Sequence, residues 1–89
     1  MKLGDLITPN PECGFLNNEV YLYTDSSLRD HEFHIHFRVG EIGTLLELNV
    51  AYQEYNDLYD DIKEWIPVCK ILTPSGIGWI MRNYLSVVH

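Results

Sequence analysis

Hydrophobic and polar residues alternate along much of this chain, and the alternation predicts β-strands. The clearest case is EFHIHFRV, residues 32–39. Successive side chains of a strand point to opposite faces, so this segment predicts a strand with one buried face. That face would carry Phe33, Ile35, Phe37 and Val39. The longest strand candidate is GTLLELNVAYQ, residues 43–53, and its apolar face would carry Leu46, Leu48, Val50 and Tyr52.

Shorter runs of β-forming residues predict further strands, separated by segments rich in proline, glycine and asparagine. We expect these strands at residues 3–8, 19–24, 66–72, 77–81 and 85–88, with an irregular loop from residue 9 and a 3₁₀-like connector at 82–84. Pro67 indicates that its strand starts at a sheet edge. Segment 54–65, EYNDLYDDIKEW, favours an acidic hairpin loop, with one helical turn as an alternative. Short antiparallel strands at this spacing predict a small all-β barrel.

The segment TPSGIGWI, residues 73–80, could be either a phosphate-binding loop or a hairpin turn. A phosphate loop usually leads into a helix N-terminus and often carries a lysine, whereas this segment leads into an aromatic strand. Proline at 74 and glycine at 76 suit a tight turn. We therefore interpret the segment as a turn whose second glycine allows close packing of strands.

The chain has 89 residues, which corresponds to one domain, 1–89, and a net charge of −7. The chain has only six lysines and arginines but thirteen acidic residues. Binding to nucleic acid or to an anionic membrane surface is therefore not expected. No apolar stretch is long enough for a signal peptide or a membrane span, which predicts a soluble, cytoplasmic protein. Cys13 and Cys69 are expected to be free thiols, with a disulfide as the alternative.

The closing segment GWIMRNYLSVV resembles the last two strands of the Src-homology-3 (SH3) fold. The matching positions are Gly78, Trp79, Ile80, Asn83, Tyr84 and Leu85. Trp65 lies upstream at about the spacing of the tryptophan that opens the middle strand in those domains. Met81 and Arg82 depart from the proline and serine of peptide-binding SH3 domains. Over residues 2–8 and 40–88 the chain is similar to small SH3-like β-barrel proteins of tailed bacteriophages, cyanophages among them. The resemblance implies about five antiparallel strands, with residues 9–39 as an inserted β-hairpin.

Several aromatic residues could line an exposed groove that binds a proline-containing peptide. Beside an acidic loop, such a groove would favour a peptide with lysine or arginine; the alternative is that the rings cover the core. The candidate binding residues are Trp65, Tyr84, Asn83, Tyr52, Tyr55 and Tyr59, with Asp57 and Asp60 from the acidic loop. The partner would be an unidentified host or phage protein, in the host cytoplasm or on the virion. A second hypothesis is a structural protein that forms homo-oligomers through strand edges and the hairpin of residues 19–39.

A third hypothesis is a zinc-binding domain, because His34 and His36 would project from one strand face together with Glu32. The alternative is a polar outer face. The acidic residues 54–64 do not follow the spacing of a calcium-binding loop. No nucleophile, base and orienting residue can be grouped from the sequence, so we expect neither an enzyme nor a cofactor.

Overall fold

A computed structural model describes residues 1–56, 58 and 61–89; the side chains of residues 31–34, 55, 56 and 62 are not described. The regular secondary structure of the described chain consists of β-strands and single 3₁₀ turns. The strands are β1 (Leu6–Pro9), β2 (Glu19–Tyr23), β3 (His31–Arg38), β4 (Gly43–Asn56), β5 (Asp61–Thr73), β6 (Gly76–Met81) and β7 (Leu85–Val87), and the turns are η1 (Pro11–Cys13), η2 (Leu16–Asn18) and η3 (Arg82–Tyr84). A helix long and apolar enough to cross a membrane is absent from the described residues.

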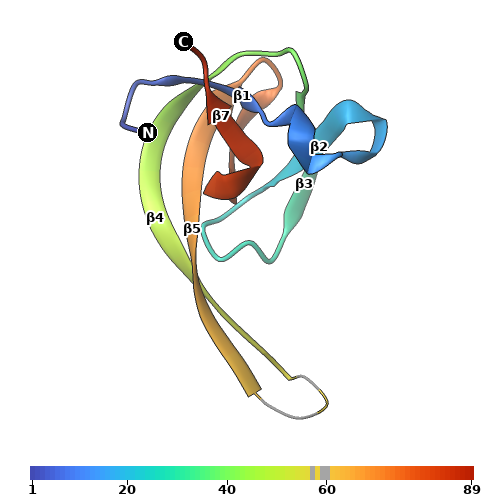
Figure 1. Ribbon diagram of the computed structural model, residues 1–89, viewed down its shortest axis with the longest axis vertical. Helices are drawn as coiled ribbons and strands as arrows, with labels where there is room; N and C mark the ends of the chain where they lie inside the picture. The colour runs from blue at the N-terminus through green and yellow to red at the C-terminus, as the bar shows by residue number, and fades with distance from the viewer. Residues whose placement is uncertain (57, 59–60) are drawn as a thin grey trace.

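The seven strands form one antiparallel sheet in the order β3-β2-β6-β5-β4-β1-β7. The sheet curls into a half-barrel, and its edge strand β3 approaches β1 and β5 (Figure 1). The expectation of an antiparallel all-β fold is thereby confirmed. The expectation of about five strands is wrong, because the β2–β3 hairpin joins the same sheet through the pairing of Tyr23 with Trp79.

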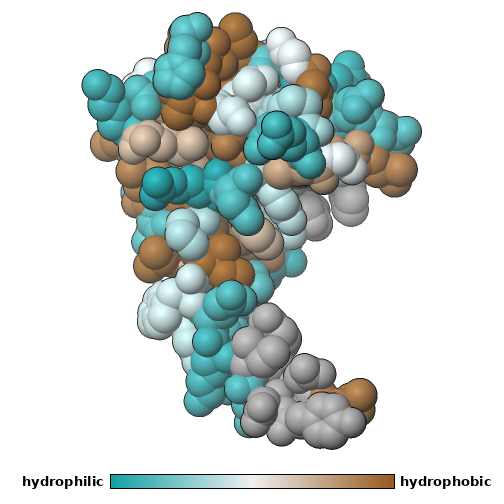
Figure 2. Space-filling view, in the orientation of Figure 1, coloured by the Kyte–Doolittle hydropathy of each residue, from teal (hydrophilic) through white to brown (hydrophobic). Residues whose placement is uncertain are grey.

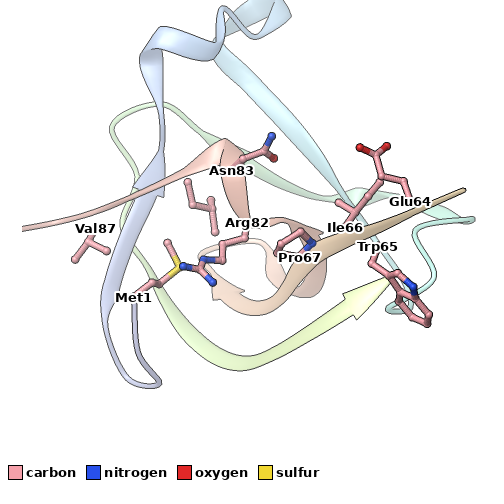
Figure 3. A pocket seen from close by; sticks show the side chains of 9 residues that line it. Met1, Glu64, Trp65, Ile66, Pro67, Arg82, Asn83 and Val87 are labelled. Atoms are coloured by element: carbon pink, nitrogen blue, oxygen red, sulfur yellow. The ribbon is translucent and has the colours of Figure 1, made fainter. Parts of the chain in front are cut away.

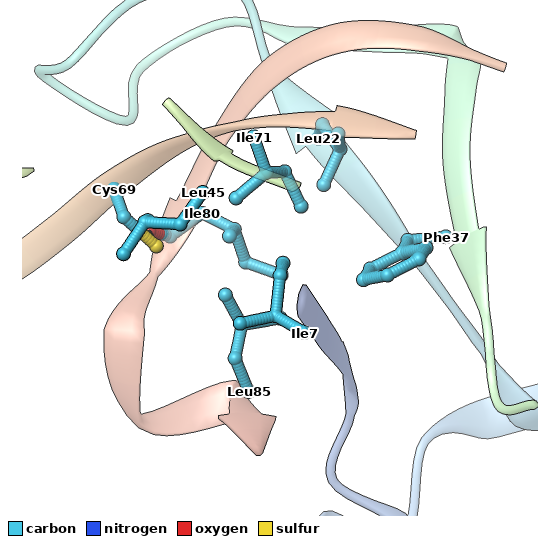
Figure 4. Close-up of a cluster of buried hydrophobic side chains, with 8 residues drawn as sticks. All are labelled: Ile7, Leu22, Phe37, Leu45, Cys69, Ile71, Ile80 and Leu85. Carbon is cyan, nitrogen blue, oxygen red and sulfur yellow. Dashed lines mark hydrogen bonds between the residues drawn. The ribbon is translucent and has the colours of Figure 1, made fainter. Parts of the chain in front are cut away.

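Every strand contributes to the main hydrophobic core, which lies on the inner face of the sheet (Figure 4). Its fully or nearly fully buried members are Ile7, Leu22, Phe37, Leu45, Cys69, Ile71, Ile80 and Leu85. A second, smaller cluster gathers Leu28, Ala51 and Val68, with Trp79 packed against it. Neighbouring residues of β5, Val68 and Cys69, thus enter different clusters, as the alternation of side chains along a strand requires.

A β-bulge in β4 changes which leucine enters the core. Leu45 lies opposite Ile71, whereas the next regular pair is Glu47 with Lys70, so Leu46 is the extra residue. Such an extra residue shifts the alternation by one position. Leu45 is therefore buried and Leu46 is exposed, which corrects the face predicted from simple alternation.

The segment TPSG forms the predicted hairpin turn between β5 and β6. The Thr73 hydroxyl oxygen accepts hydrogen bonds from the backbone N–H groups of Ser75 and Gly76, each at 3.2 Å, and it donates to the Gly76 carbonyl at 2.9 Å. Gly76 has a φ of 142°, a conformation that side-chain-bearing residues rarely adopt. The interpretation as a turn is confirmed.

Strands β4 and β5 are longer than the sequence predicted and project beyond the sheet. Their pairing runs from Thr44 and Leu72 to Asn56 and Asp61, whereas β6 accompanies β5 only as far as Val68. Residues 50–56 and 61–67 therefore form a two-stranded ribbon that extends away from the barrel (Figure 1). Pro67 lies where β6 stops, so the missing N–H of proline leaves the β5–β6 pairing intact.

Candidate partner-binding groove

One face of the β4–β5 hairpin carries a row of exposed apolar side chains, which we call the apolar stripe. Directly opposed residues of antiparallel strands point to the same face. The opposed pairs are Leu48 with Cys69, Val50 with Pro67, and Tyr52 with Trp65. Because Cys69 belongs to the main core, the stripe of Leu48, Val50, Tyr52, Trp65 and Pro67 continues the core face outward into solvent.

The exposed fractions along the stripe are large for apolar side chains. They are 66% for Trp65, 50% for Val50, 43% for Tyr52 and 41% for Leu48. Figure 2 shows the projecting ribbon at the bottom of the view, with its described part coloured mostly from teal to white. A contiguous apolar surface of this kind is a feature of binding sites, whereas single exposed hydrophobic residues are common everywhere.

The two aromatic rings of the stripe support one another. The ring centroids of Tyr52 and Trp65 are 5.0 Å apart, with an angle of 54° between their planes. Cross-strand aromatic pairs at this distance stabilise a two-stranded ribbon and restrict the rotation of both rings. Trp65 is therefore held in place although two thirds of it is exposed.

A hollow of about 510 Å³ lies beside the stripe, where β6 ends and the chain turns through η3 (Figure 3). It is lined by Met1, Glu64, Trp65, Ile66, Pro67, Arg82, Asn83, Leu85 and Val87. A second hollow of about 350 Å³ adjoins it and shares Pro67 and Arg82, with Leu48, Asn49 and Val50 as its other lining residues. The two hollows and the stripe together form the candidate groove.

The groove contains part of the predicted binding set. Trp65 and Asn83 line the larger hollow, and Tyr52 packs against Trp65. Tyr84 does not line it: its ring packs edge-on against Phe15, at 5.3 Å and 88°, and it borders a different hollow of about 340 Å³. Asn83 and Tyr84 point in different directions because both lie in the single turn η3. This turn directs Asn83 to the groove and Tyr84 to the core.

The acidic part of the prediction falls mainly outside the described residues. Asp57, Tyr59 and Asp60 are not described, and neither is the side chain of Tyr55. The described carboxylates of this region are Glu54, Asp61 and Glu64, all exposed, and Glu64 lines the larger hollow. The ion pair of Glu54 with Lys63 has an N–O distance of 3.8 Å and is more than half exposed on both sides, so it contributes little to stability.

Sequence reasoning missed Pro67 and Arg82. Pro67 could have been found from its position two residues after Trp65, since strand residues two apart share a face. Arg82 carries the positive charge of the groove, and no described carboxylate forms an ion pair with it. Its placement depends on where β6 ends, which no local sequence signal gives.

The predicted zinc set is described only at His36. The side chains of Glu32 and His34 lie outside the described part. Both ring nitrogens of His36 lie 3.2 Å from the Ser75 hydroxyl oxygen, and the Tyr21 ring packs edge-on at 6.5 Å. Among the described residues no group of three or more potential ligands could hold a metal ion, and zinc binding stays a prediction.

Away from the groove, Arg38 and Tyr21 both form hydrogen bonds with Glu19. Arg38 donates a hydrogen bond of 3.0 Å to Glu19, which lowers the pKa of that carboxyl group. The hydrogen bond from the Tyr21 hydroxyl to Glu19 raises the pKa of Tyr21. Both cysteines are free thiols, as predicted, and burial raises the pKa of Cys69 to about 11.

Comparison of the chain with protein-family models, with curated proteins and with solved structures finds no match in any of the three.

Proposed function

We propose that this chain is a non-catalytic protein-interaction module, an SH3-like barrel that binds a protein or peptide in the groove beside Trp65. The observation that carries the proposal is the apolar stripe, which presents a rigid, exposed tryptophan next to a hollow of about 510 Å³. Tryptophan is enriched among the residues that dominate binding energy at interfaces, especially beside pockets that exclude water. The SH3-like character and the origin in a bacteriophage rest on the sequence resemblance.

Charge indicates what kind of partner the groove would attract. The chain carries a net charge of −7, and the segment 54–64 holds five acidic residues and one lysine. An acidic surface speeds encounter with basic partners and disfavours acidic ones. The partner is therefore expected to be a host or phage protein with lysine or arginine near an apolar contact.

The experiment that tests the proposal is affinity capture with two matched variants. Trp65→Ala removes the most exposed ring of the stripe, and Leu16→Ala, in η2, removes an apolar side chain that is 85% exposed elsewhere. Because both side chains are largely exposed, both variants should stay folded; Trp65→Ala also loses its contact with Tyr52, which should lower its melting temperature by less than about 8 °C. The proposal expects a partner that the wild type and Leu16→Ala retain and Trp65→Ala loses. A partner retained equally by all three proteins would place binding elsewhere and overturn it.

Self-association is a second candidate, favoured by the edge strand β3. This strand has eight residues and stands at one end of the sheet order, where it approaches β1 without pairing in a ladder. Long edge strands are templates for pairing with another chain. A sedimentation experiment over a hundredfold range of concentration tests this: a rising mass supports the candidate, and a constant monomer mass contradicts it.

A further inference from the structure

The outer part of β5 has an unpaired edge. Strand β6 pairs with β5 from Thr73 to Val68, and β4 pairs with it from Leu72 to Asp61. Within the described chain, no third strand pairs with residues 61–67. An edge of this kind presents a row of N–H and C=O groups to which another strand can be added.

Pro67 indicates which backbone groups face the open side. Proline has no N–H to donate, and within sheets it occurs where its nitrogen faces away from a paired strand. Pro67 pairs with Val50 on the β4 side, so its nitrogen faces the side that β6 has left. Backbone N–H and C=O groups of residues two apart in a strand point to the same side. The N–H and C=O groups of Trp65 and Lys63 therefore face the open side, as the nitrogen of Pro67 does.

The larger hollow lies along this same edge. Four consecutive residues of β5, 64–67, form one wall, and residues that follow β6 form the other. Figure 3 shows Arg82 and Asn83 across from the segment of β5 that carries Ile66 and Trp65. The hollow is thus the space that β6 would fill if it continued straight.

We propose that an extended peptide binds by adding as a strand to residues 61–67 of β5, in the place where β6 stops. This rests on the proposed function and names its binding mode. The side chains of Trp65 and Pro67 lie on one face of β5, and Glu64 lies on the other. The peptide therefore alternates apolar residues, which meet the stripe, with lysine or arginine, which meets Glu64 on the other face.

Charge disfavours a second copy of this chain as the occupant. Two copies carry −7 each, and two ribbons side by side would bring their carboxylates together. Like charges at an interface oppose association, whereas a lysine or arginine of an added strand complements Glu64. Arg82 lines the hollow at the end of the edge nearest β6, so the basic residues of the peptide are disfavoured at that end.

Hydrogen exchange of the ¹⁵N-labelled chain, followed by NMR, tests the proposal. The probe is a synthetic seven-residue peptide of alternating valine and lysine with acetylated and amidated ends. The amides of Trp65 and Lys63 should exchange at least about tenfold more slowly with the peptide bound, whereas those of Glu64 and Ile66, already paired with β4, should change little. Unchanged exchange at Trp65 and Lys63 in the saturated complex would overturn the proposal.

Two N-methylated forms of the peptide provide a matched control. One carries methyl groups on its valine nitrogens and the other on its lysine nitrogens, so each blocks one edge of the added strand. Loss of one backbone hydrogen bond weakens binding by about fivefold. The peptide whose methylated nitrogens face β5 should therefore bind at least about tenfold more weakly than the peptide whose methylated nitrogens face solvent.

The outcomes separate this proposal from the function on which it rests. Equal binding of both methylated forms, together with loss of binding in Trp65→Ala, would leave the groove in place and overturn strand addition. Absence of peptide binding at millimolar concentration would also overturn strand addition, while the capture experiment decides the proposed function. A dimer that slows exchange of the Trp65 and Lys63 amides without any peptide would show that a second copy of the chain occupies the edge. That result would overturn the assignment of a basic peptide to this place.

Discussion

Replacing Gly78 with alanine is expected to destabilise the fold, because this glycine lets β2 and β6 approach closely. A Cβ atom built at Gly78 would lie 2.6 Å from Leu22 Cβ, 3.1 Å from Leu22 Cδ1 and 3.2 Å from the Tyr23 carbonyl oxygen. Carbon atoms in favourable contact are about 3.5–4.0 Å apart. Rotation of Leu22 cannot relieve the first contact, since Cβ is fixed to the backbone. The two strands must separate by about 1 Å.

The size of the effect follows from two opposing contributions. Overpacking a dense core costs about 1–3 kcal/mol, and a contact between fixed atoms belongs at the upper end of that range. Removing a glycine from a strand gains about 0.5–1 kcal/mol through the unfolded chain. The net loss is about 2 kcal/mol, which lowers the melting temperature of a domain this small by about 8–16 °C.

Thermal and urea unfolding, followed by far-UV circular dichroism, measure this change. The matched control is Ile77→Ala, whose neighbouring side chain is half-exposed and meets no such contact; it should cost about 1 kcal/mol or less. A Gly78→Ala variant that melts within about 3 °C of the wild type would refute the close approach of β2 to β6.

Three further outcomes are expected. The Cys69 thiol, whose pKa is raised to about 11, should resist alkylation at pH 8 while exposed Cys13 reacts. Because the unfolded thiol ionises near 9.0, stability should fall more steeply in the wild type than in Cys69→Ala as pH rises from about 9 to 11. Acrylamide should quench the fluorescence of Trp65 more strongly than that of half-buried Trp79, and comparison of Trp65→Phe with Trp79→Phe assigns the two signals. Thr73→Val, which removes the hydroxyl that accepts from two turn amides, should cost about 1–2 kcal/mol in urea unfolding, and an unchanged midpoint would contradict that role.

Local pattern predicted much of the sheet but not where its strands end. Phe37 alternates with polar neighbours and is buried as expected, and the glycine and proline of residues 73–76 marked a turn that the structure contains. Residues 54–65 were predicted as an acidic hairpin loop because the segment is short, carries two adjacent aspartates and is closely followed by Pro67. Residues 54–56 and 61–65 pair instead, since cross-strand contacts such as Tyr52 with Trp65 depend on a partner strand rather than on local propensity.

The candidate site was predictable to the extent that strand alternation determines it. Trp65 and Asn83 were placed in one groove from the sequence, and both line the larger hollow. Arg82 was missed because its position depends on β6 ending at Met81, and Tyr84 was misplaced because one 3₁₀ turn rotates adjacent side chains apart. Register shifts and turns of this kind arise from packing between distant segments, which a single sequence does not display.

The length of the projecting ribbon can change without any change in the hydrophobic core of the barrel. Its outer pairs, from Tyr52 with Trp65 to Asn56 with Asp61, form a ladder in which each rung contacts mainly its neighbours. Inserting or deleting two residues in each strand would keep every remaining side chain on its own face, because the strand repeat is two. The arm could therefore be lengthened or shortened by about 7 Å at a time, leaving the barrel unchanged, so the same core could serve partners whose contact points lie at different distances.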